Sequence, residues 1–283
     1  MENVEKSIIQ IPVRDGSTIP ALLYQPIAAP KGGSPLLVCY HGGGWCLGTP
    51  ETDELSCVNA VQHFGAVCLS VDYRVAPEHP FPTPINDSWD ALEWIANNSS
   101  QLRASPSQGF LVHGESAGAN IAIVIALLAR DRKLNPPITG VSASAPVVLS
   151  PEMVPDKYKA EYQSRTQNND APVLSGNYLS YLVGHYKPDQ NSPLFNCFNW
   201  PTGHHGLPPI HFQICGLDPL RDEGLLYEKV LRTEYNVRTK LTIYPGLPHT
   251  FWYFFPDLEV SKTVAGNTTA GFEWMLNGVK LRK

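Results

Sequence analysis

The stretch GFLVHGESAGANIAIVIALLA at residues 109–129 decides how this chain is expected to fold. It opens with a short apolar run of strand formers, and from Ala117 onward it is apolar on all sides, as in a buried helix. Between these two parts, Gly114-Glu-Ser-Ala-Gly118 fits a sharp turn with Ser116 at its centre. Such a turn strains its central residue and needs small neighbours, because strand and helix approach closely. The stretch therefore predicts a serine held where a strand gives way to a helix.

A second motif, His41-Gly-Gly-Gly-Trp45, follows another apolar run at residues 35–40. Glycines in such a loop can present backbone N–H groups to the oxygen that becomes negative when a serine attacks a carbonyl carbon. The helix that begins after Ser116 adds a partial positive charge at the same place. Either motif alone is a weak signal, but the pair in this order predicts an acyl-transfer site.

The base and the acid that such a serine requires can be sought by elimination. In α/β-hydrolases the nucleophile is followed along the chain by the acid and then by the histidine. His249 is the one histidine beyond residue 218, and it follows a strand-like run at 239–244. Asp218 lies just beyond the C-terminal end of the strand expected at 209–215, where such folds build their sites. Asp222 is the competing acid, although its place in the first turn of the next helix is also explained by the helix dipole.

Five segments together resemble the hormone-sensitive-lipase branch of the α/β-hydrolases, which also includes bacterial and fungal carboxylesterases. They are His41–Trp45, Asp72-Tyr-Arg-Val-Ala-Pro-Glu-His-Pro-Phe-Pro82, Gly114–Gly118, Asp218-Pro-Leu-Arg-Asp-Glu-Gly224 and Gly246-Leu-Pro-His249. The resemblance implies hydrolysis of a small-molecule carboxylic ester without a cofactor. It implies Ser116 as the nucleophile, His249 as the base and Asp218 as the acid that orients the base. It also implies an oxyanion hole with three backbone N–H donors, those of Gly42, Gly43 and Ala117.

Four neighbouring residues are expected to shape the pocket or to support the site: His41, Gly44, Trp45 and Glu115. We expect His41 to shape the glycine loop through hydrogen bonds rather than to transfer protons. Glu115 is expected to support the turn at the serine, and the alternative is that it tunes the surroundings of His249. Trp45 is expected either to form a wall of the pocket or to pack the loop.

Strand and helix patterns alternate along the chain after a β-rich start at residues 5–26. Further strands are expected near 36–40, 66–72, 109–113, 139–145, 209–215 and 239–244, and helices near 51–63, 85–97, 117–134, 221–235 and 258–279. The alternation predicts an α/β-hydrolase fold, with a mostly parallel central sheet covered by helices on both faces. The first two strands, joined at Asp15-Gly16, predict a hairpin that forms an antiparallel edge.

Residues 147–207, which are rich in proline and tyrosine, interrupt the alternation after the sixth strand. We expect them to form a small cap, with short helices near 157–165 and 175–186, inserted into a catalytic domain of residues 1–146 and 208–283. The tyrosines either line an aromatic pocket or pack the cap onto the main domain. Many relatives carry a second cap segment before the first strand. Because strand-like sequence begins here by about residue 5, we expect a more open cleft, or one completed by another subunit.

Composition narrows the class of partner. The chain has 283 residues, of which 43% are hydrophobic and 17% charged, and this suits one large α/β domain. A net charge of −5 without a basic stripe predicts no nucleic-acid partner. The start lacks a signal-peptide pattern, and the apolar run at 121–129 is too short to cross a bilayer. We therefore expect a cytoplasmic monomer or homodimer that does not bind membranes.

Metal ions and disulfides are not expected. The six cysteines lack zinc-ligand spacing, and the adjacent pair His204 and His205 would chelate one ion poorly.

Three residues of the segment at 72–82 are expected to form a polar network: Asp72, Arg74 and Glu78. Asp87 and Asp90 start a helix and are expected to be solvated or to cap it.

The leading interpretation is a serine carboxylesterase for small to medium, uncharged esters. A second keeps the nucleophile but changes the substrate, as a lactonase, an arylformamidase-like amidase or a natural-product esterase. The segment at 73–82 favours the esterase branch over arylformamidases. A third is a non-catalytic ligand receptor on the same fold, as in the plant gibberellin receptors, which lack the catalytic histidine. The presence of His249 argues against that class, although a fold alone never fixes function.

Overall fold

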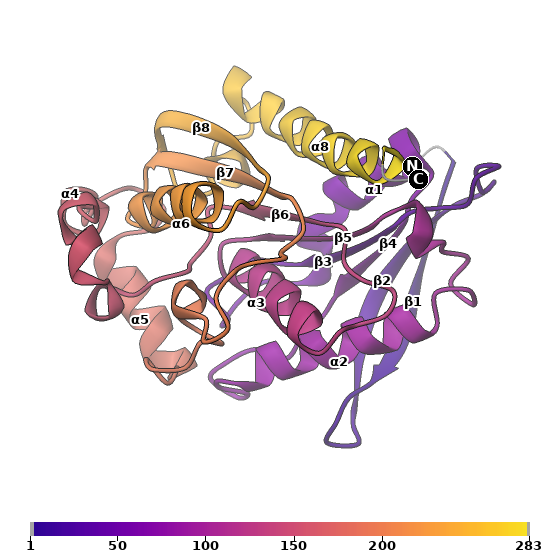
Figure 1. Ribbon diagram of the computed structural model, residues 1–283, viewed down its shortest axis with the longest axis horizontal. Helices are drawn as coiled ribbons and strands as arrows, with labels where there is room; N and C mark the ends of the chain where they lie inside the picture. The colour runs from indigo at the N-terminus through magenta and orange to yellow at the C-terminus, as the bar shows by residue number, and fades with distance from the viewer. Residues whose placement is uncertain (1–2, 282–283) are drawn as a thin grey trace.

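The computed structural model describes residues 3–281, and an eight-stranded sheet runs through its centre (Figure 1). The strands are β1 (Val4–Pro12), β2 (Thr18–Pro26), β3 (Leu36–Tyr40), β4 (Val67–Val71), β5 (Phe110–Glu115), β6 (Gly140–Ser144), β7 (Ile210–Leu217) and β8 (Thr239–Pro248). They lie in the order β1-β2-β4-β3-β5-β6-β7-β8. The β1–β2 and β2–β4 pairs are antiparallel, and the pairs from β4 to β8 are parallel. The mostly parallel sheet and the antiparallel hairpin edge predicted from the sequence are confirmed.

Helices cover both faces of this sheet (Figure 1). On one face lie α1 (Glu54–Phe64) and α8 (Glu259–Lys280), and on the other lie α2 (Thr83–Asn97), α3 (Ala117–Asp131) and α6 (Arg221–Glu234). Successive strand residues point to opposite faces, so in β3 Val38 packs toward α3 and Cys39 toward α1. Both faces are apolar because both are covered. Among residues 3–281, no helix is both long and apolar enough to span a membrane.

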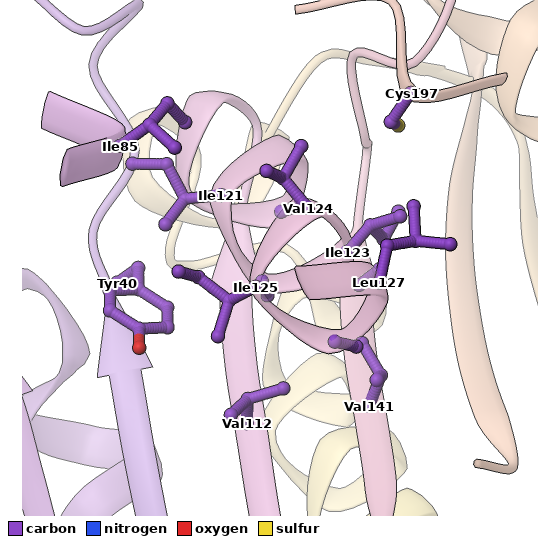
Figure 2. Close-up of a cluster of buried hydrophobic side chains, with 14 of the residues drawn as sticks. Tyr40, Ile85, Val112, Ile121, Ile123, Val124, Ile125, Leu127, Val141 and Cys197 are labelled. Atoms are coloured by element: carbon purple, nitrogen blue, oxygen red, sulfur yellow. The ribbon is translucent and has the colours of Figure 1, made fainter. Parts of the chain in front are cut away.

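Helix α3 forms the centre of the core and is buried on all sides from Ala117 to Leu127. Figure 2 shows its branched side chains, with Ile85 of α2 on one side and Val112 and Val141 of β5 and β6 beneath. Burying one such side chain contributes roughly 1.5–3 kcal/mol. The helix that follows Ser116 is therefore held firmly in the core.

The helices and strands lie within a few residues of their predicted ranges, and two differences have clear causes. Helix α3 ends at Asp131 rather than near 134, because Lys133 takes a left-handed conformation with φ 55. Strand β8 runs to Pro248 rather than 244, because its pairing with β7 continues past an irregularity to the pair Leu217 and Pro248. His249 thus follows directly on the end of the strand.

The segment between β6 and β7 consists of short helices. They are η3 (Pro151–Met153), η4 (Asp156–Glu161), α4 (Ser164–Gln167), α5 (Gly176–Tyr186) and η5 (Cys197–Asn199). The helix expected near 157–165 is split into η4 and α4, and the one expected near 175–186 is α5. Asn120 of α3 anchors the segment at two points far apart in the sequence, since its Nδ2 donates to the carbonyl oxygens of Val147 and Phe195, each at 2.9 Å.

The expectation that Asp87 and Asp90 are solvated or cap the start of a helix is wrong, because both lie inside α2, whose N-cap is Pro82. Asp87 is 1% exposed and accepts hydrogen bonds from the guanidinium of Arg74 at 2.7 and 2.8 Å. Asp90 accepts from Arg14, which follows β1. Arg74 thus pairs with Asp87, and also with Asp15, rather than with Asp72 and Glu78. The reason is tertiary, because packing turns this face of α2 toward the β1–β2 hairpin.

Candidate active site

Ser116 lies between β5 and α3 in a strained backbone conformation, with φ 54 and ψ −118. Such strain costs about 1–3 kcal/mol and persists only where the surroundings enforce it. The Ser116 N–H donates to the carbonyl oxygen of Ser144 at 2.8 Å, which ties the turn to β6. A Cβ at Gly118 would overlap the carbonyl oxygen of Tyr40, and one at Gly114 would overlap that of Gly118. Glycine is required at both positions because strand and helix backbones nearly touch.

The ring of His249 lies between Ser116 and Asp218. Its Nε2 is 2.9 Å from Ser116 Oγ, and its Nδ1 is 2.7 Å from Asp218 Oδ2. The other oxygen of Asp218 accepts the N–H of Leu220 at 2.8 Å, which fixes the carboxylate. A neutral imidazole that donates its Nδ1–H to a carboxylate presents a lone pair at Nε2. This arrangement can withdraw a proton from the serine hydroxyl.

Asp222, the competing acid, is engaged elsewhere. Its Oδ2 accepts the N–H groups of Gln163 at 2.7 Å and Ser164 at 2.6 Å. It therefore anchors the start of α4 to α6. Of the two aspartates weighed from the sequence, Asp218 is the one within hydrogen-bond distance of His249.

The glycine loop lies against the serine. A Cβ at Gly42 would stand 3.6 Å from the Cβ of Ser116. Among residues 3–281, the N–H groups of Gly42 and Gly43 take no part in backbone hydrogen bonds. The N–H of Ala117 is the first of α3, where no partner exists within the helix. These donors can turn toward a negative oxygen at the serine, where the helix dipole is also favourable.

Tyr73, which the sequence analysis did not single out, supports this loop. Its ring stacks on His41, with centroids 4.2 Å apart, and its hydroxyl donates to the His41 carbonyl oxygen at 2.6 Å. The Nδ1 of His41 lies 2.8 Å from the Gly42 carbonyl oxygen. Burial lowers the pKa of His41 to about 4, so its ring is neutral near pH 7. Tyr73 lies in the segment at 72–82 that carries the family resemblance, so the sequence did point toward it. Its contact with His41 depends on tertiary packing, which no local sequence pattern reveals.

Trp45 and Gly44 join the loop to α5. Trp45 is 1% exposed, and its ring stacks on Tyr186 with centroids 4.5 Å apart. A Cβ at Gly44 would stand 2.6 Å from Cδ1 of Leu182, so glycine allows this close approach. Trp45 also borders the cavity beside the serine. Both roles considered for this residue are therefore compatible with its position.

A cavity of about 250 Å³ opens beside Ser116 and His249. One wall comes from the segment between β6 and β7, with Val173, Leu174, Tyr178, Leu179 and Leu182. Another comes from the short helix α7 (Phe251–Phe254), which follows His249 and contributes Tyr253 and Phe254. No lysine or arginine is among the described residues that line the cavity, and its one carboxyl group is that of Glu115. The cavity suits an uncharged, apolar ligand.

Glu115 is 5% exposed beneath this cavity. Burial raises its pKa to about 7, and the polar groups of Tyr253 and Trp252, with the charge of His249, oppose the shift. Its Oε1 also lies 4.0 Å from Nε2 of His113 on the same strand. The position fits both roles weighed from the sequence, since Glu115 adjoins the serine and faces the helix that follows His249.

Known proteins are similar to this chain in sequence and in fold. The profile of the alpha/beta hydrolase fold family matches residues 37–253. An AB hydrolase superfamily protein of Schizosaccharomyces pombe is 39% identical over 279 residues, which cover 99% of this chain and 82% of that protein. Versiconal hemiacetal acetate esterase of Dothistroma septosporum is 32% identical, and the match covers 88% of this chain and 76% of that protein. Carboxylesterase NlhH of Mycobacterium tuberculosis is 36% identical, and the match covers 93% of this chain and 81% of that protein. The crystal structure of vibralactone cyclase is similar, with a TM-score of 0.93 and 34% identity, and the match covers 98% of this chain and 82% of that one.

The parallel sheet, the strained serine turn and the matched profile together define the class. The chain belongs to the α/β-hydrolase fold family. Within that family it is a carboxylic ester hydrolase of the hormone-sensitive-lipase-like carboxylesterase branch, as the resemblance of its five segments implied.

Proposed function

We propose that this protein is a serine esterase that hydrolyses small to medium, uncharged carboxylic esters through Ser116, His249 and Asp218. The observation that carries the proposal is the hydrogen-bonded row from Ser116 Oγ through His249 to Asp218, at 2.9 and 2.7 Å, beside an apolar cavity. His249 takes the hydroxyl proton as Ser116 attacks the ester carbonyl. Asp218 keeps the imidazole in the required tautomer and stabilises the imidazolium.

The remaining steps use the glycine loop and water. The N–H groups of Gly42, Gly43 and Ala117 stabilise the tetrahedral oxyanion, and losing one such donor typically costs about 3 kcal/mol. His249 then returns its proton to the departing alcohol, which leaves an acyl group on Ser116. Water attacks this acyl-enzyme with His249 as base, and the acid is released. In this scheme residues 147–207 act as a cap inserted into the catalytic domain of residues 1–146 and 208–283.

The test is turnover of p-nitrophenyl esters from acetate to dodecanoate by the wild-type protein and three variants. Ser116→Ala should abolish both burst and turnover, while Ser107→Ala, at an exposed serine, should behave as wild type. Asp218→Asn should lower kcat about 10⁴-fold because it favours the wrong imidazole tautomer. Undiminished turnover by Ser116→Ala would refute the proposal. The chain length at which kcat/KM peaks would measure the size of the acyl site.

A second candidate is lactone formation or opening, and the similarity to vibralactone cyclase favours it. In the forming direction, a hydroxyl on the acyl chain attacks the acyl-enzyme carbonyl in place of water. Its proton passes to His249 and then to the departing Ser116 oxygen, so that a lactone and the free enzyme result. Mass spectrometry of products from a hydroxyacyl ester decides between the two reactions, because the lactone is lighter than the hydroxy acid by one water.

A further inference from the structure

Four large apolar side chains stand exposed around the mouth of the cavity. Leu47, Tyr178, Tyr253 and Phe254 all line it, and they are 53%, 41%, 45% and 60% exposed. Scattered exposed apolar residues are common on proteins. Apolar residues gathered around one opening instead mark a contact surface. We refer to these four residues as the apolar rim.

Parts of the apolar rim are held in place by contacts that leave the rings exposed. The hydroxyl of Tyr253 donates to the carbonyl oxygen of Thr52 at 3.3 Å. Tyr178 lies nearly parallel to Tyr181, with centroids 6.4 Å apart and planes at 14°. Phe254 makes no ring–ring contact within residues 3–281, although it is the most exposed of the four. A flat partner is therefore able to reach it without displacing another ring.

The size and charge of the cavity indicate which part of a ligand extends over the apolar rim. At about 250 Å³ the cavity is smaller than the roughly 300–1,000 Å³ that enclose a drug-sized ligand. A larger ester must therefore project through the mouth. No lysine or arginine is among the described lining residues, so a negative charge on the projecting part of the ester would have no cationic side chain to pair with there. Aromatic rings favour a flat, apolar partner in offset or edge-to-face contact.

We propose that the apolar rim is a binding subsite for a flat, uncharged aromatic group on the alcohol side of the ester, with a small acyl group such as acetyl in the cavity at Ser116. The orientation follows from the order of steps, because the alcohol departs first and the mouth is its exit while the acyl group stays on the serine. The inference rests on the proposed esterase function and names the substrate class of that site.

The experiment compares 1-naphthyl acetate with ethyl acetate, which carry the same acyl group on an aromatic and a small aliphatic alcohol. Phe254→Ala should lower kcat/KM for 1-naphthyl acetate about five- to tenfold more than it lowers kcat/KM for ethyl acetate. Phe254→Tyr, which keeps a flat ring, should restore the wild-type value. The matched control is Phe255→Ala, since Phe255 is 42% exposed but does not line the cavity. Equal losses on both esters, or no loss on either, would overturn the subsite.

A binding measurement separates this inference from the proposed function. In a Ser116→Ala background the ester should persist, so the Kd of 1-naphthyl acetate can be measured by equilibrium dialysis. Adding Phe254→Ala should weaken binding about five- to tenfold, and adding Phe255→Ala should not change it. If the wild-type protein turns over neither ester, the proposed function fails, and the binding ratio still decides the subsite. An unchanged Kd in the Phe254→Ala background would refute the subsite even in an active esterase.

Discussion

Replacing Arg165 by methionine would break a buried ion pair that joins the segment between β6 and β7 to α6. Glu223 is 0% exposed, and its Oε2 accepts from Nη2 and Nε of Arg165 at 2.6 and 3.1 Å. The same oxygen accepts the hydroxyl of Tyr162 at 2.9 Å, and Oε1 accepts the N–H of Val148 at 2.8 Å. The methionine side chain fills much of the space of arginine but carries no charge and donates no hydrogen bond.

The expected loss follows from the carboxylate that remains. Removing one partner of a buried ion pair costs about 3–5 kcal/mol, because the other charge stays buried without compensation. In a chain of this length, 1 kcal/mol corresponds to about 2 °C in Tm, so the melting temperature should fall by about 6–10 °C. Burial raises the pKa of Glu223, and Arg165 opposes that shift. Without Arg165 the folded pKa rises further, so the loss should be greatest at high pH and shrink as pH falls.

The assay is urea unfolding of the wild type, Arg165→Met, Glu223→Gln and the double variant at pH 5.5 and pH 8. Arg103→Met is the matched control, since Arg103 and Glu5 form an exposed pair with side chains 46% and 53% exposed. That control should lose less than about 1 kcal/mol. A coupling energy below about 0.5 kcal/mol in the cycle of Arg165 and Glu223 would refute the reasoning. So would a loss for Arg165→Met that grows as pH falls.

Three further predictions concern the site. Tyr73→Phe removes the donor to the buried His41 carbonyl oxygen, and we expect the free energy of unfolding to fall by about 1–3 kcal/mol, as urea unfolding would measure; an unchanged free energy of unfolding would contradict it. Gly118→Ala places a Cβ well within the 3.0 Å that such atoms keep from the Tyr40 oxygen, and the forced shift of about 1 Å at the serine should cost about 100-fold in kcat/KM; wild-type activity would contradict it. Burial raises the pKa of Glu115 from 4.5 to about 7, so the wild type loses stability as pH rises through that range. The side chain in Glu115→Gln does not ionise, so this variant does not lose stability in this way. Urea unfolding at pH 5 and pH 8 should show the stability of Glu115→Gln relative to wild type rising by up to about 3 kcal/mol, and a flat difference would exclude the shift.

The sequence by itself determined the features that depend on local patterns. Alternating strand and helix periods predicted the mostly parallel sheet, and Asp15-Gly16 predicted the hairpin edge. The residues around Ser116 predicted a strained turn, because only glycine fits where backbones approach closely. The chain order that α/β-hydrolases share drew attention to His249. All of these signals lie within short stretches, so no long-range contact was needed to read them.

Tertiary structure alone decided which polar groups face one another. Asp218 and Asp222 lie on neighbouring turns of the chain, and both fitted the sequence as partners for His249. Asp222 is occupied by the N–H groups of Gln163 and Ser164, a contact that exists only because α4 packs on α6.

The same holds for Asp87, which packing buries against Arg74, and for Tyr73 beneath the glycine loop. The apolar rim combines residues from three distant segments, at positions 47, 178 and 253–254. Side-chain direction and long-range packing place these groups together, and neither is encoded in a local pattern of residue types.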